Sequence, residues 1–219
     1  MSTTALTTAP PPAPQTLYFA YGSNLALGQM RARCPASPPL GLARLRGWRW
    51  VVSERGYANV VELPAATAAA AAHYAAALEP VGPPAAAAVA AVGGGAAWQA
   101  VVWGAVYGLG EGDEASLDGY EGVPWAYTKE RVEVEVWRGG EGGRVDVGGE
   151  PEMRECLVYV DRKRVGEGVP KEEYVGRMNA AVKDALMLGV PREYVDEVIR
   201  RFVPPDDEGK GVAEMGGES

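Results

Sequence analysis

Two short segments of this 219-residue chain combine residue types that suit chemistry. The first is YGSN at 21–24, between an apolar run at 17–21 that predicts a strand and the start of a predicted helix. The first turn of a helix leaves backbone N–H groups without internal partners and carries a partial positive charge, so it suits an anionic group. Gly22 would let a ligand or a neighbouring backbone approach closely. The same residues also fit a plain role, in which Ser23 or Asn24 caps the helix after a tight turn.

The second segment is SLDGYEGVP at 116–124. Its glycines end a short predicted helix and leave Glu121 near the carbonyl end of that helix. The negative end of the helix and an apolar, aromatic surround would both disfavour the ionised carboxylate, and so raise its pKa toward the range of a general base. The surrounding residues are Tyr120, Val123, Trp125 and Tyr127. An exposed glutamate in a turn is the alternative interpretation of Glu121.

Other reactive residues are too scarce for several reaction classes. The single histidine, His73, lies in an Ala-rich tract, where little could position an imidazole for a Ser–His–Asp or Cys–His mechanism. One histidine and two cysteines are also too few for a zinc site. We expect Cys34 and Cys156 to be free, buried thiols, unless the fold brings them together as a disulfide. Proton transfers would therefore fall to carboxylates, Tyr or Lys.

Charge and hydropathy exclude further classes of partner. The formal net charge is −8, without the basic footprint of a nucleic-acid binder. No stretch approaches the roughly 20 uninterrupted apolar residues of a membrane span. The first residues lack the basic start and apolar core of a secretory signal. We expect a cytoplasmic protein, monomer or homodimer, with no nucleic-acid and no membrane partner.

Apolar patterns outline the elements that would position the two segments. The strict alternation of TKERVEVEVW is typical of a half-exposed strand. The predicted strands cover 17–21, 40–53 (one or two strands), 56–63, 98–109, 128–137 and 155–161, and the predicted helices lie within 111–122, from Pro170 to Gly189 and from Pro191 onward. Strands dominate the first two thirds and helices the end, without regular β–α alternation. This order predicts an α+β domain with a mostly antiparallel sheet that could be closed.

Composition separates one domain from its appendages. We place the domain at 16–206, after a disordered Pro/Thr/Ala-rich arm at 1–15 and before a flexible tail at 207–219. Within the domain, the Ala-rich stretch 65–97 has few large side chains to bury and is predicted to be a surface insert. The Gly-rich stretch 138–154 is predicted to be a mobile loop between two strands.

Together, the two segments resemble a known family. YGSNL after an N-terminal strand, followed later by LDGYEGV, resembles the γ-glutamylcyclotransferase family of the γ-glutamylcyclotransferase-like, or AIG2-like, superfamily. Three more stretches are similar to family segments, namely GYANVV (56–61), CLVYV (156–160) and GVPREYVDEVIRRFVPPD (189–206). The resemblance covers roughly 16–64, 98–137 and 155–206, and leaves out the arm, the insert, the Gly-rich loop and the tail.

The resemblance implies a fold, a reaction and a site. The fold is a small, mostly antiparallel β-barrel with flanking helices. The reaction closes the α-amine of a γ-glutamyl substrate on its own γ-carbonyl, which forms 5-oxoproline and needs no cofactor and no metal. Glu121 takes the role of the acid and base, while Tyr127 and Tyr159 wall the pocket and donate hydroxyl hydrogen bonds. The γ-glutamyl part is held by Tyr18, Phe19, Ala20, Tyr21, Gly22, Ser23 and Asn24.

Several substrates and one silent role remain open at this point. The continuation of YGS by Asn24 and Leu25 favours the branch that acts on γ-glutamyl amino acids over the glutathione-specific branch. The alternatives are an enzyme for glutathione, γ-glutamyl amines such as γ-glutamyl-ε-lysine, or a γ-glutamyl conjugate of secondary metabolism, and a catalytically silent module that binds γ-glutamyl ligands. No substrate role is assigned to Arg44, Arg46 or Arg55, and the role of the insert is left open.

Overall fold

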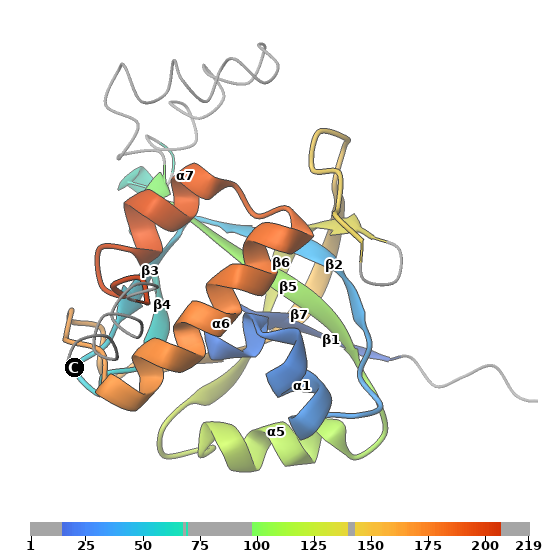
Figure 1. Ribbon diagram of the computed structural model, residues 1–219, viewed down its shortest axis with the longest axis horizontal. Coiled ribbons are helices and arrows are strands. Elements are labelled where there is room, and N and C mark those ends of the chain that lie inside the picture. Colours follow the sequence, from blue (N-terminus) through green and yellow to red (C-terminus); the bar gives the residue numbers. More distant parts are fainter. Residues whose placement is uncertain (1–14, 68, 70–97, 140–142, 207–219) are drawn as a thin grey trace, which may run out of the picture.

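The computed structural model, which describes residues 15–67, 69, 98–139 and 143–206, is built on a closed barrel of five strands (Figure 1). The order around the barrel is β1-β5-β2-β6-β7. The strands are β1 (Thr16–Ala20), β2 (Pro39–Arg46), β5 (Val101–Leu109), β6 (Thr128–Arg138) and β7 (Glu152–Val160). Neighbouring strands run antiparallel, apart from β1 and β7, whose parallel pairing closes the barrel. The prediction of a mostly antiparallel, closed sheet is confirmed.

A small sheet and several helices flank the barrel, which confirms the α+β class. The sheet is an antiparallel hairpin of β3 (Trp48–Val52) and β4 (Ala58–Glu62). The helical elements are the 3-10 turn η1 (Ser23–Leu25), α1 (Leu27–Arg33), α5 (Asp113–Glu121), α6 (Glu172–Leu188), α7 (Arg192–Tyr194) and the π-helical η2 (Val195–Ile199). In Figure 1, α6 (orange) crosses in front of the barrel and contacts η1, and α5 (light green) lies next to α1.

The burial of the strands follows their sequence patterns. All nine residues of β5 are buried, as suits a strand of Val and aromatic residues between two neighbouring strands of the barrel. In β6, Val134 and Val136 are buried whereas Glu133 is exposed, which confirms the predicted alternation. Cys34 and Cys156 are both buried and free, as predicted.

The helix after YGSN differs from its prediction in start and cap. Residues Ser23–Leu25 form a 3-10 turn, α1 begins at Leu27, and no side chain caps either element from its N-cap position. The Leu27 N–H instead donates to Asp184 Oδ2 of α6 at 2.8 Å. The expectation that Ser23 or Asn24 caps the helix is therefore wrong, because a carboxylate from a distant helix satisfies the free N–H group.

The C-terminal helices were predicted in part. Helix α6 ends where expected, before Gly189, which has the left-handed φ of 116° that favours glycine. The helix predicted from Pro191 is one α-turn followed by a π-helical segment, in which the Arg200 N–H donates to the Val195 carbonyl at 2.9 Å. Its wider turns bury Val195, Val198 and Ile199.

Several predictions fall outside the described residues. They concern the arm before Gln15, His73 and nearly all of the insert after residue 67, residues 140–142 of the Gly-rich loop, and the tail from 207. The division into a domain with these appendages therefore stays a prediction. None of the described helices combines the length and the apolar character needed to cross a membrane.

Gly104 of β5 supplies a test of how tightly β5 packs against β1. A Cβ atom on Gly104 would lie 2.5 Å from the Ala20 carbonyl oxygen and 2.5 Å from the Phe19 ring. We expect Gly104→Ala to lower the free energy of unfolding by about 1–3 kcal/mol, measured by urea denaturation, because overpacking forces strand β1 to shift. In Gly176→Ala the added Cβ meets nothing within 4 Å, so this variant should be as stable as the wild type or up to about 1 kcal/mol more stable. Equal stabilities of the two variants would contradict the packing argument.

Candidate active site

The YGSN turn follows β1 and is held by hydrogen bonds to three other strands. The Trp50 indole N–H of β3 donates to the Tyr21 carbonyl at 3.0 Å. The Tyr21 hydroxyl donates to the Tyr159 carbonyl of β7 at 2.6 Å. The Tyr107 hydroxyl of β5 donates to the Asn24 carbonyl at 3.1 Å. The conformation of the turn therefore depends on the assembled barrel and hairpin rather than on its own sequence.

Gly22 permits a close approach of α6 to this turn. A Cβ atom on Gly22 would lie 3.0 Å from the Tyr174 hydroxyl oxygen and 3.2 Å from the Ala58 Cβ. The Tyr174 hydroxyl accepts a hydrogen bond from the Ala58 N–H at 3.3 Å. Burial raises the pKa of Tyr174 to about 12, and the backbone N–H groups of Ala58 and Ser23 beside its oxygen oppose that rise. The glycine thus makes room for neighbouring side chains, whereas the sequence predicted a ligand or a neighbouring backbone at this place.

Asn24 joins the two predicted segments through its side chain. Its Nδ2 donates to Glu121 Oε1 at 3.0 Å, across 97 residues of sequence, and to the Tyr18 hydroxyl at 2.9 Å. Its Oδ1 accepts hydrogen bonds from Gln29 Nε2 at 2.8 Å and from Arg33 Nη1 at 2.9 Å. Because two donors from α1 hold the oxygen, the amide has to turn its NH₂ group toward Glu121.

Glu121 is the last residue of α5, which ends at Gly122 in the left-handed conformation (φ 65°). Loss of water around the carboxyl group raises the pKa of Glu121. The positive charge of Arg33 and the hydrogen bond from Asn24 oppose this rise, followed by the charges of Arg177 and Arg55. The predicted direction of the shift is confirmed, and desolvation is its main cause.

The source of that dry environment differs from the prediction. Trp125 is 81% exposed and is not among the described residues around the carboxyl group, and Tyr120 contributes only an edge, since it is 58% exposed. Glu121 instead lines a cavity of about 210 Å³, smaller than the roughly 300–1,000 Å³ of a pocket for a drug-sized ligand. The predicted site residues that line this cavity are Glu121, Tyr18, Tyr21, Gly22, Ser23, Asn24, Tyr127 and Tyr159.

Phe19 and Ala20 are the two predicted binding residues that the structure places elsewhere. Both are fully buried in the barrel core and neither is among the described residues that line the cavity. Phe19 points to the face of β1 opposite to Tyr18, since successive strand residues alternate, and Ala20 pairs with Ala105 of β5. The expectation that these two residues contact a ligand is therefore corrected, and their role is to pack the strand that leads into the turn.

Tyr127 and Tyr159 line the cavity, but their hydroxyl groups already bind protein groups. The Tyr127 hydroxyl donates to the Ala58 carbonyl at 2.8 Å, and the Tyr159 hydroxyl donates to Asp118 Oδ1 at 2.7 Å. Burial raises the pKa of both phenols far above neutrality, so both stay protonated. They can shape the cavity, while proton transfer is left to Glu121.

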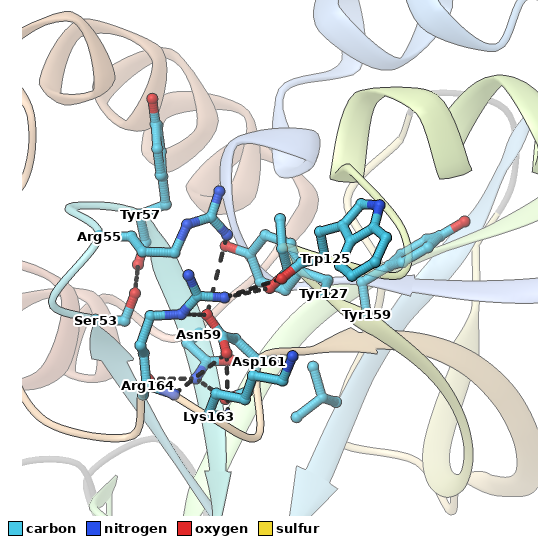
Figure 2. A network of polar contacts seen from close by, with 12 residues as sticks. Ser53, Arg55, Tyr57, Asn59, Trp125, Tyr127, Tyr159, Asp161, Lys163 and Arg164 are labelled. Atoms are coloured by element: carbon cyan, nitrogen blue, oxygen red, sulfur yellow. Dashed lines mark hydrogen bonds and ion pairs between the residues drawn. The ribbon is translucent and has the colours of Figure 1, made fainter.

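Three arginines on the cavity were missed as site residues from the sequence. Arg33, Arg55 and Arg177 all line it, together with Tyr57 and Tyr174. Figure 2 shows Arg55, from the turn of the β3–β4 hairpin, lying between the Tyr57 and Tyr127 side chains. A signal existed for Arg177, which follows Tyr174 by one helical turn on the same face of α6. No such periodicity marks Arg55, because it lies in a turn.

Comparisons with known proteins bear on the fold. Residues 101–198 match the AIG2-like family model. A solved structure named gamma-glutamyl cyclotransferase is 20% identical, with a TM-score of 0.57, over 91% of this chain and 94% of that one. At 20% identity this neighbour shows the fold alone, so the chain has the γ-glutamylcyclotransferase-like fold.

Two further solved structures share this fold. An uncharacterised human protein is 21% identical with a TM-score of 0.57, over 92% of this chain and 95% of that one. YkqA from Bacillus subtilis is 17% identical with a TM-score of 0.55, over 88% of this chain and 56% of that one. At such identities the neighbours establish the fold alone. Among curated proteins, none matches the chain.

The raised pKa of Glu121 can be measured without any activity assay. We expect the carboxyl carbon of Glu121, assigned by its loss in Glu121→Gln, to titrate above the ordinary glutamate pKa of 4.5 in NMR spectra of glutamate-labelled protein. In Asn24→Ala the midpoint should move further up, because the lost hydrogen bond stabilises the ionised form. A midpoint at or below 4.5, or one that Asn24→Ala leaves in place, would contradict this account of the site.

Proposed function

We propose that this protein is a γ-glutamylcyclotransferase, which converts a γ-glutamyl amino acid into 5-oxoproline and the free amino acid. The observation that carries the proposal is the hydrogen bond from Asn24 of the YGSN turn to Glu121, at the wall of a small cavity. This places a carboxyl group of raised pKa next to polar groups suited to a zwitterionic substrate. The AIG2-like match and a structural neighbour named gamma-glutamyl cyclotransferase support it.

The reaction needs one group that both accepts and donates protons. The α-amine nitrogen of the substrate attacks its own γ-carbonyl carbon, and the bond from that carbon to the leaving nitrogen then breaks. Two protons leave the α-ammonium group, and two arrive on the leaving nitrogen, which departs as an ammonium. Glu121 accepts a proton from the attacking amine as a carboxylate and returns it to the leaving nitrogen as a carboxylic acid. A raised pKa suits both steps, because it brings the pKa of the Glu121 carboxyl group closer to that of the amine with which it exchanges the proton.

Positions around Glu121 suggest how the substrate would be held. Asn24 occupies Oε1 of Glu121, which leaves Oε2 for the substrate amine. The Tyr18 hydroxyl accepts its hydrogen bond from Asn24 and so keeps its own hydrogen to donate, whereas Tyr127 and Tyr159 donate theirs to protein groups. Burial raises the pKa of Tyr18 well above its usual value, so it is a neutral donor suited to the oxyanion that develops on the γ-carbonyl.

Glu121→Gln is the direct test of this mechanism. We expect 5-oxoproline release from γ-glutamyl-alanine, followed by chromatography, to fall at least about 10²-fold, since general acid–base catalysis contributes about 10²–10⁴-fold. Glu114→Gln on the same helix α5, where Glu114 pairs with Lys129, should keep wild-type turnover. Normal turnover by Glu121→Gln would refute the proposal. A wild-type protein that binds γ-glutamyl-alanine but releases no 5-oxoproline would be the catalytically silent module.

The same variant has a pH-dependent effect on stability. The folded state raises the pKa of Glu121, so the stability that this residue contributes falls as the pH rises from 4.5 through the folded pKa. Glu121→Gln removes this pH-dependent loss of stability, because glutamine does not ionise. We therefore expect its melting temperature to equal or exceed that of the wild type at pH 7, with a difference that shrinks as the pH is lowered to about 4. A variant clearly less stable than the wild type at pH 7 would show that the carboxylate is a structural ion-pair partner instead.

A competition assay would identify the preferred leaving group. The informative panel contains γ-glutamyl dipeptides, glutathione and γ-glutamyl-ε-lysine, with 5-oxoproline as the common product. We expect the dipeptides to be turned over most efficiently, because Asn24 and Leu25 continue the YGS motif in the form that favours γ-glutamyl amino acids. A preference for glutathione or for the isopeptide would assign the protein to one of the alternative substrates.

A further inference from the structure

The cavity carries more positive charge than Glu121 balances. Among the described residues that line it, Glu121 is the one acid, whereas Arg33, Arg55 and Arg177 are all cationic. Arg33 has a clear task, because its Nη1 donates to Asn24 at 2.9 Å and its guanidinium lies over the Tyr120 ring. Arg55 and Arg177 have no comparable task within the turn.

Arg55 presents a buried nitrogen without a hydrogen-bond partner. Its Nη1 makes no hydrogen bond within the described part of the chain, and its nearest carboxylate oxygen, Asp161 Oδ2, is 4.0 Å away. Arg164 already pairs with that oxygen at 2.7 Å, as Figure 2 shows. Besides this long ion pair with Asp161, the Arg55 guanidinium contacts aromatic faces, 5.6 Å from the Tyr57 ring centre and 5.3 Å from that of Tyr127.

Arg177 is arranged in a similar way and also lies near Tyr57. Its Nε is buried and makes no hydrogen bond within the described residues, and Glu173 Oε2 on the same helix is 3.7 Å away. Its guanidinium lies 5.0 Å from the Tyr174 ring centre and 6.0 Å from that of Tyr57. Tyr57 therefore contacts both guanidinium groups, and its hydroxyl donates to Glu173 at 3.0 Å. The two arginines come from the β3–β4 hairpin and from α6, so this pair is fixed by tertiary structure.

An unsatisfied buried guanidinium nitrogen is costly, and an anion that supplied an acceptor would remove that cost. A carboxylate suits the planar donor geometry of arginine, and aromatic faces orient the guanidinium without occupying its N–H groups. Both charges oppose the rise of the Glu121 pKa, which places them within electrostatic range of that carboxyl group. Arg55 and Arg177 belong to neither the YGSN turn nor α5. If the turn holds the γ-glutamyl part of a substrate, the two arginines are free to bind a second carboxylate elsewhere in the same substrate.

We propose that Arg55 and Arg177, which both lie against the Tyr57 ring, form a subsite for the α-carboxylate of the amino acid that leaves. This inference rests on the proposed function and adds the residues that set its specificity. Arg55 and Arg177 act as positioning residues, because they hold the far end of the substrate while Glu121 transfers the proton. The subsite selects γ-glutamyl amino acids over γ-glutamyl amines that lack this carboxylate.

Two substrates that differ by one carboxylate test the subsite. γ-Glutamyl-alanine and γ-glutamyl-ethylamide share the reacting atoms, and the second lacks the leaving-group carboxylate. We expect Arg55→Gln and Arg177→Gln each to lower kcat/KM for γ-glutamyl-alanine about tenfold or more, chiefly through KM, as for the loss of one partner of a desolvated charge pair. For γ-glutamyl-ethylamide each variant should stay within about twofold of the wild type. Arg164→Gln also loses an ion pair with Asp161 but does not line the cavity, so it should leave the ratio of the two substrates unchanged.

The outcomes separate this inference from the proposed function. If Arg55→Gln and Arg177→Gln lose kcat/KM equally on both substrates, or if Arg164→Gln changes the ratio of the two kcat/KM values in the same way, the subsite is overturned. Release of 5-oxoproline by the wild type would still support the proposed function. Release from neither substrate by the wild type would refute the function, and calorimetry would then decide on the subsite. In that case, tighter binding of γ-glutamyl-alanine than of the ethylamide, lost in Arg55→Gln, supports the subsite, and equal binding overturns it.

Discussion

The hydrogen bond between Asn24 and Glu121 is the contact on which the rest of the site depends. It can form because the Asn24 oxygen is held by Gln29 and Arg33, which fixes the direction of the amide. The turn that carries Asn24 is itself held by the Tyr107 hydroxyl from β5. The Asn24 residue therefore links the barrel, the turn and helix α5. A displacement of any of these elements would alter the hydrogen bond to the Glu121 carboxyl group.

Two opposing electrostatic effects act on that carboxyl group. Loss of water favours its neutral form, whereas the hydrogen bond from Asn24 and the three arginines favour its ionised form. Desolvation is the largest of these effects, so the net direction of the pKa shift is upward. A group that accepts a proton and then returns it, as proposed for Glu121, needs both forms, and opposing effects of this kind favour that.

Local patterns predicted the elements well and side-chain partners poorly. Alternation in β6, the continuous apolar run of β5 and the glycine after Glu121 were sufficient, because each depends on neighbouring residues. The use of the Asn24 side chain could not be predicted, since its partner lies 97 residues away. The exposure of Trp125 and the place of Arg55 on the cavity were also missed, because both depend on how elements distant in the sequence pack together.

The parallel pairing of β1 with β7 joins the first and last strands of the barrel, with Tyr18 opposite Leu157. The Tyr21 hydroxyl crosses the same junction to the Tyr159 carbonyl. The cavity is thus built at the place where the two ends of the barrel meet. During synthesis the chain already contains YGSN and Glu121 long before β7 is made, yet the turn lacks one of its anchors. Completion of the site must therefore await closure of the barrel, so that a partly folded chain cannot present the assembled cavity.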